Sequence, residues 1–210
     1  MRTNPFGDTL EFLIEPEWTT AVFWALLIAS VAIAALVFRR DPTQRTSRHL
    51  WMFASRLMIG AMWWQQTLWK LPPTYTDQED GSGGLRFWME EMTKNAAFRA
   101  QANLVKDVFL PHFQFFAAQV YALEVAIALS LMLGLFTRLG GTLAFFQALN
   151  LWLGLYRAPA EWPWTYFFLM IVSGSFAIFQ AGRSLGVDAI LAARPAGEPR
   201  GLRRLIQLAT

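Results

Sequence analysis

Five long apolar segments constrain what this chain can fold into more than any other feature. They occupy residues 18–38, 51–71, 113–136, 139–156 and 162–180. Each approaches the ~20 residues that an α-helix needs to cross a hydrocarbon core of about 30 Å. Charged residues make up 16% of the 210-residue chain, against about 25% in an ordinary soluble domain. The sequence therefore predicts an all-α, polytopic membrane protein.

Two charges lie well inside these segments. Glu124 is the single charged residue of segment 113–136, and Arg56 lies within segment 51–71. A carboxylate near the middle of a membrane costs a few kcal/mol, so it needs a cation, a proton or a function. We expect either a buried Arg56–Glu124 ion pair that holds two helices together, or a proton-carrying Glu124 beside a quinone.

Basic residues predict the orientation of the chain in the membrane. With the N-terminus outside, ten basic residues fall on the cytoplasmic side, in 39–50, 137–138 and 181–210, against seven outside. Such an excess follows the positive-inside rule. The first apolar segment has no basic region before it, and Arg39 and Arg40 follow it, so we interpret it as a retained helix rather than a signal peptide. The predicted location is the cytoplasmic membrane of a bacterium or archaeon, with the C-terminus in the cytoplasm.

Several kinds of chemistry are excluded or unsupported. The chain has no cysteine, which excludes disulfides and cysteine-bound clusters on this chain. Its two histidines, His49 and His112, fall on opposite membrane faces in this topology, so no metal or two-histidine haem site is expected. The net charge of +3 comes from arginines that topology explains, so no nucleic-acid partner is expected. No nucleotide-binding loop or catalytic triad pattern occurs, and no catalytic residue is assigned.

The longest connection, residues 72–111, is expected on the outside. It begins with two prolines and an acidic, glycine-rich turn, and two stretches with apolar residues at helical spacing follow. These residues are Leu85, Trp88, Met89 and Met92, then Phe98, Ala102, Val105 and Phe109. They predict two short helices on the membrane surface or across the mouth of the bundle; the alternative is a lid or a docking surface. The basic tail, 192–210, is expected to bind anionic lipid or a partner subunit.

A second group of residues suggests a quinone site. A quinone needs a flat apolar slot with one or two hydrogen-bond donors, and amide, indole and phenol groups can provide these. The candidates are Trp63, Trp64, Gln65, Gln66, Gln119, Tyr121, Gln147 and Asn150. The same residues could instead bond neighbouring helices or anchor the membrane interface. Lys70 and Arg157, near the outer face, could attract an anion such as thiosulfate or simply extend toward lipid headgroups.

Four local patterns occur in order along residues 50–191. They are RLMIGAMWWQQTLWKL in the second segment, LMLGLFTR at the end of the third, LGGTLAFF in the fourth and AGRSLGVD after the fifth. This set resembles the DoxX/DoxD family of small four-helix membrane proteins, which includes the membrane subunit of thiosulfate:quinone oxidoreductase. The residues that carry the resemblance are Gly60, Lys70, Gly134, Thr137, Arg138, Gly182, Arg183 and Asp188.

The resemblance implies a domain organisation and two functions. Residues 50–191 are expected to form a DoxX-like four-helix bundle, 1–49 an extension with one additional transmembrane helix, and 192–210 a cytoplasmic tail. One expected function is an accessory subunit of a larger respiratory or photosynthetic complex, which packs on lipids and other subunits and has no covalently bound cofactor. The alternative is the quinone-reactive membrane subunit of a sulfur-compound oxidoreductase. Family membership alone does not decide between them.

Overall fold

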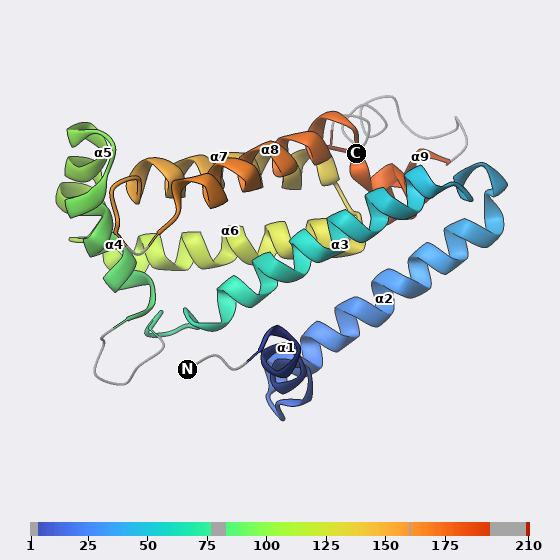
Figure 1. The fold of residues 1–210 in the computed structure, drawn as a ribbon, viewed down its shortest axis with the longest axis horizontal. Helices are drawn as coiled ribbons and strands as arrows, with labels where there is room; N and C mark the ends of the chain where they lie inside the picture. The colour runs from blue at the N-terminus through green and yellow to red at the C-terminus, as the bar shows by residue number, and fades with distance from the viewer. Residues whose placement is uncertain (1–3, 77–82, 160, 194–208) are drawn as a thin grey trace.

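The regular structure of the described chain is helical throughout. The computed structural model describes residues 4–76, 83–159, 161–193 and 209–210 (Figure 1). The acidic turn at 77–82 and nearly all of the basic tail, two features of the sequence predictions, lie outside these residues.

Five helices coincide with the five apolar segments. They are α2 (Trp18–Arg40), α3 (Ser47–Leu68), α6 (Phe113–Leu133), α7 (Thr137–Gly154) and α8 (Pro163–Ile178). Among the described helices, α2 and α6 are long and apolar enough to cross a membrane, and α8 is apolar but shorter. The prediction of an all-α chain with helices long and apolar enough to cross a membrane is thus confirmed, whereas the number of spans stays a prediction.

Local chemistry sets the ends of these helices. Thr46 caps the start of α3, since its hydroxyl accepts a hydrogen bond from the His49 amide at 3.4 Å. The last turn of α2 carries Arg39 and Arg40, whose charges complement the helix dipole. The helix α6 ends at Gly134, which has the left-handed conformation (φ 67°) that favours glycine.

The bundle is built from α3, α6, α7 and α8, with α6 between α3 and the α7–α8 pair (Figure 1). Its core contains Trp63, Ile127, Leu131, Met132, Ala144 and Phe176. At Gly60 a Cβ atom would lie 2.8 Å from the backbone nitrogen of Met132, so α3 and α6 approach too closely for any larger residue. This contact sets the antiparallel register of α3 and α6.

Two helices precede the bundle. The helix α2 packs on the α3–α6 face, where the Ser30 hydroxyl donates to the Met132 carbonyl at 2.6 Å. Before it lies α1 (Pro5–Ile14), a short helix that the sequence analysis did not predict. Asn4 caps α1 by accepting from the Gly7 amide at 2.6 Å.

The end of the bundle at which α6 begins and α7 ends is covered by a helical cap. The cap consists of α4 (Gly84–Asn95), α5 (Arg99–Leu104) and a π-helical turn at Val105–Phe109. Its apolar side, which includes Met89, Met92 and Val105, packs against Phe113 and Ala117 of α6 and Leu155 after α7 (Figure 1). The helices of segment 72–111 therefore lie across this mouth of the bundle.

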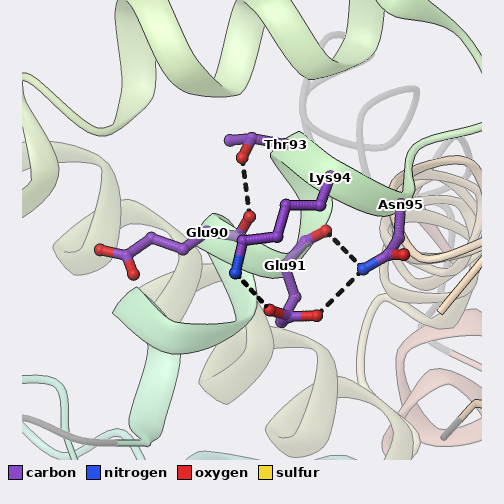
Figure 2. Close-up of polar contacts among 5 residues, drawn as sticks. All are labelled: Glu90, Glu91, Thr93, Lys94 and Asn95. Carbon is purple, nitrogen blue, oxygen red and sulfur yellow. Dashed lines mark hydrogen bonds and ion pairs between the residues drawn. The ribbon is translucent and has the colours of Figure 1, made fainter. Parts of the chain in front are cut away.

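The last turn of α4 is pinned by its own polar side chains (Figure 2). Lys94 Nζ lies 2.7 Å from Glu91 Oε1, and Asn95 Nδ2 donates to Glu91 Oε2 at 3.0 Å. The turn is joined to the end of α7 through the Asn95 carbonyl, which accepts from the Arg157 amide at 2.9 Å. These contacts fix the edge of the cap to the loop between α7 and α8.

Candidate functional site

A cluster of charged and polar side chains is buried in the bundle at the middle of α6. The Glu124 carboxylate forms an ion pair with Lys70, which follows the end of α3, and accepts from Gln147 Nε2 of α7 at 3.1 Å. Glu124 and Lys70 are only 1% and 3% exposed, and Gln147 is also buried. The cluster therefore joins three elements of the bundle away from water. We call Lys70, Glu124 and Gln147 the buried triad.

The surroundings of the triad are aromatic. Lys70 Nζ lies 4.2 Å from the centre of the Trp69 ring, in a cation–π arrangement. Trp63 and Trp64 lie one to two turns back along α3, and their indole nitrogens are buried without a hydrogen-bond partner. A buried donor without a partner costs about 1–3 kcal/mol.

The prediction that Arg56 pairs with Glu124 is wrong, because a different cation contacts the Glu124 carboxylate. The register at Gly60 places Arg56 beside the C-terminal end of α6, where it donates to the carbonyl oxygens of Leu131 and, at 3.0 Å, of Met132. Glu124 lies eight positions before Met132, about 12 Å away along the helix at 1.5 Å per residue. Lys70 meets Glu124 instead.

The spacing of residues along α3 indicates this pairing. Arg56, Gly60, Trp63, Thr67 and Lys70 follow one another at alternating spacings of four and three residues. Such residues share one face of a helix. All five are buried, so the face that turns Arg56 toward α6 also turns Lys70 toward it.

Arg56 belongs to a second buried assembly, at the turn between α6 and α7. The last carbonyls of a helix have no partner within the helix, and Arg56 and Ser30 supply donors to those of α6. The residue after α6, Gly134, lies against the guanidinium: a Cβ there would be 2.8 Å from Arg56 Cζ. Arg56 thus acts as a side-chain cap for α6.

Asp188, in α9 (Val187–Ala192), caps the other side of the same turn. Its carboxylate accepts from the amides of Phe136 and Thr137 at 2.7 and 2.9 Å and from the Thr137 hydroxyl at 2.7 Å. These amides start α7, where an acceptor is needed. Burial raises the pKa of Asp188, while the hydrogen bonds from Thr137 and Phe136 and the nearby Arg56 charge act in the opposite direction.

The residues of the family pattern meet at this turn. Gly182 donates its amide to the Thr137 hydroxyl at 2.8 Å, and a Cβ on Gly182 would lie 2.3 Å from Asp188 Oδ2. Arg183 is half-buried in the adjacent turn, and Arg138 is half-buried in the first turn of α7. We call Arg56, Gly134, Thr137, Gly182 and Asp188 the turn junction. Its geometry explains why GLFTR and AGRSLGVD occur together in one chain.

The eight residues predicted for a quinone site do not form one group. Gln147 belongs to the triad, but Asn150 accepts from Gln101 of the cap at 2.8 Å. Gln65, Gln66 and Gln119 are exposed on the outer faces of α3 and α6. Tyr121 is half-buried, and its ring centre lies 6.3 Å from that of Tyr75. The eight residues therefore face different parts of the bundle, and whether some of them bind a quinone stays a prediction.

The predicted anion site of Lys70 and Arg157 is also wrong. Lys70 is turned inward to Glu124, whereas Arg157 lies in the loop after α7 and contacts the Ala97 carbonyl at 3.4 Å. His49 forms a 2.8 Å hydrogen bond with Ser184, in the turn between α8 and α9. In the described ranges no three histidine or acidic side chains gather as metal ligands.

Two hollows of the described surface lie away from the triad. Each has a volume of about 610 Å³; one is at the start of α6, beside Arg86 and His112, and the other at the start of α3, beside Arg48 and Trp51. The triad itself is packed between helices. A ligand that reaches it has to come through the helix packing or past the cap.

An all-helical bundle with membrane-length helices and a buried ion pair defines a small integral membrane protein. The model of the family described as "TQO small subunit DoxD" matches residues 87–199, slightly more than half of the chain, and the chain belongs to this family. The matched range contains Glu124, Gln147 and Asp188, whereas Arg56 and Lys70 precede it. No curated protein and no solved structure matches the chain.

Proposed function

We propose that this protein is the membrane subunit of a quinone-linked oxidoreductase and that its buried triad exchanges protons with the quinone. The observation that carries the proposal is the Lys70–Glu124 ion pair at the middle of α6, a helix apolar enough to cross a membrane. Ionisable residues at such depth are expensive and are commonly functional. Membership of the DoxD family supports a quinone as the substrate.

The triad has the groups that such a reaction needs. Reduction of a quinone adds electrons and protons together, so the oxygen that gains a proton needs an acid nearby. Glu124 is the proton carrier in this proposal, and Lys70 compensates its charge when the proton has left. Gln147 holds the carboxyl in place through its 3.1 Å hydrogen bond. The unpartnered indole N–H groups of Trp63 and Trp64 are the donors for the quinone oxygens.

Electrons come from a partner subunit in this proposal. The described residues carry no cluster of metal ligands, and the chain has no cysteine. We place the five helices α2, α3, α6, α7 and α8 across the cytoplasmic membrane, with the N-terminus outside, the C-terminus in the cytoplasm and the cap on the outer side. The partner and the quinone then meet the bundle at, or close to, the capped mouth.

Substitution of Glu124 tests the proposal. The Glu124→Gln variant keeps the size of the side chain and removes its proton, so we expect quinone turnover by the purified complex to fall at least about tenfold, a typical share for general acid–base catalysis. The Glu124→Asp variant, which keeps a carboxyl group, is expected to retain part of the quinone turnover. The matched control is Thr137→Ser, which keeps the buried hydroxyl of the turn junction and should leave turnover unchanged. Normal turnover per complex in Glu124→Gln, with less assembled protein, would contradict the proton role.

A second candidate function is supported by the outer surface of the bundle. Large apolar residues are exposed on α7 and α8, among them Phe146, Phe168, Ile171 and Ile178. Such a surface suits contacts with other membrane subunits as well as with lipid. In this reading the chain is an accessory subunit of a respiratory or photosynthetic complex, and the triad is a structural lock. Purification in mild detergent distinguishes the two: co-elution with cytochrome or pigment-binding subunits and no quinone turnover would favour the accessory role.

A further inference from the structure

The helix α1 carries an apolar stripe that the described residues leave uncovered. Phe6, Leu10 and Ile14 recur every four residues and therefore share one side of the helix. They are 85%, 58% and 70% exposed. At 100° per residue, Asp8 points away from this stripe, whereas Glu11 lies at its border, about 60° from Ile14. The helix is thus amphipathic, with its apolar side facing outward instead of toward the bundle.

The direction of the stripe is fixed by contacts on another side of α1. Trp24 Nε1 of α2 donates to the Leu13 carbonyl at 2.9 Å. The rings of Phe12 and Phe23 meet edge to face, with centres 5.3 Å apart. Because these contacts hold α1 against α2, the stripe cannot turn inward without breaking them.

The stripe continues the exposed apolar surface of α2. Only three residues separate the end of α1 at Ile14 from the start of α2 at Trp18, and α2 is long and apolar enough to cross a membrane. Exposed apolar residues of α2 include Trp18 and, near its middle, Ile28. In Figure 1, α1 is seen nearly end-on beside the first turns of α2, so it lies across the direction of that helix.

We propose that α1 is an interfacial helix that lies flat on the lipid surface at the N-terminal end of α2. Its partner is the boundary between headgroups and acyl chains, which takes up Phe6, Leu10 and Ile14 while Asp8, on the opposite side, remains in water and Glu11 lies at the water level. The acidic side makes neutral headgroups a better partner than anionic ones. The proposal rests on α2 crossing the membrane and is independent of the quinone reaction.

Spin labels on single cysteines test the proposal, because the chain has no cysteine of its own. Each residue from Phe6 to Ile14 is replaced in turn, and the labelled full-length protein is placed in phosphatidylcholine vesicles. Labels at Phe6, Leu10 and Ile14 should collide readily with oxygen, which partitions into lipid, and poorly with a water-soluble nickel chelate. A label at Asp8 should show the reverse and one at Glu11 should be intermediate, so that depth varies with the period of a helix.

An Ile28→Cys label reports separately on α2. Protection of Ile28 from the nickel chelate, with Leu10 as accessible to it as Asp8, would overturn the interfacial position of α1 alone. Access of the chelate to Ile28 would show that α2 does not cross the membrane, and the proposal for α1 would then be wrong as well. A stripe protected from both oxygen and nickel would mean that protein, such as a second copy of the chain, covers it instead of lipid. In phosphatidylglycerol vesicles the stripe labels should become more accessible to nickel.

Discussion

The segment of α3 and the two residues after it bury two cations, Arg56 and Lys70, and the two cations have different tasks. Near the middle of α3, Arg56 donates to the carbonyls at the end of α6. Just beyond the end of α3, Lys70 pairs with the carboxylate of Glu124. Arg56 faces Asp188, but both of these residues are bound mainly to backbone groups. In the turn junction, the charged side chains form hydrogen bonds with backbone groups at helix ends. In the triad, the two charged side chains pair with each other.

This difference bears on which site is available for chemistry. The free carbonyls and amides at a helix end need partners whatever else the protein does. Glu124 lies in the middle of α6, where the backbone groups are already paired within the helix. A buried ion pair can often be replaced by apolar residues with little loss of stability. Stability alone therefore gives no reason for a triad at this depth, whereas it explains the turn junction fully.

The largest effect is expected from Lys70→Met. It leaves Glu124 buried without its cation, a change that typically costs about 3–5 kcal/mol. The double variant Lys70→Met/Glu124→Gln should recover most of that loss, since no charge remains. Thermal unfolding in detergent measures both. A double variant as unstable as Lys70→Met would show that the triad, like the turn junction, is needed by its surroundings.

A smaller loss, without recovery, is expected at the turn junction. Arg56→Met and Asp188→Ala each remove hydrogen bonds between a charged group and the backbone, worth about 1.5–3 kcal/mol. The double variant should be less stable than either single variant, because the Leu131 carbonyl of α6 and the first amides of α7 are then left without side-chain partners. The same unfolding measurement applies. Recovery in the double variant would mean that the Arg56–Asp188 attraction, and not capping, holds the turn.

The smallest effect is expected from Ser30→Ala. The Ser30 hydroxyl donates to the Met132 carbonyl, which also accepts from Arg56 at 3.0 Å. The carbonyl keeps one partner, so the loss should stay within about 0.5–1.5 kcal/mol. In the Arg56→Met background the same change should cost more, because the Met132 carbonyl then loses both donors. Equal costs in the two backgrounds would show that Ser30 and Arg56 do not share the capping of α6.

Sequence predictions about the positions of single apolar helices were correct, whereas the prediction about a contact between two helices was wrong. The positions of the apolar helices and the membrane class followed from apolar length alone, and the resemblance to DoxX/DoxD is confirmed by the family match. The partner of Glu124 was predicted wrongly, because it depends on how far α3 slides along α6. The close approach at Gly60 sets that register. A shift of α3 by two turns along α6 would bring Arg56, in place of Lys70, to Glu124.

The sequence by itself determined which residues are expensive to bury: a carboxylate, an arginine and a lysine in segments that are otherwise apolar. Hydrophobicity and helical spacing are properties of a single segment, so they are visible in one chain. Only the tertiary structure decided that Lys70 and Gln147 meet Glu124 while Arg56 and Asp188 cap the turn between α6 and α7. The physical reason is that short-range contacts between helices depend on register and rotation, which no single segment specifies.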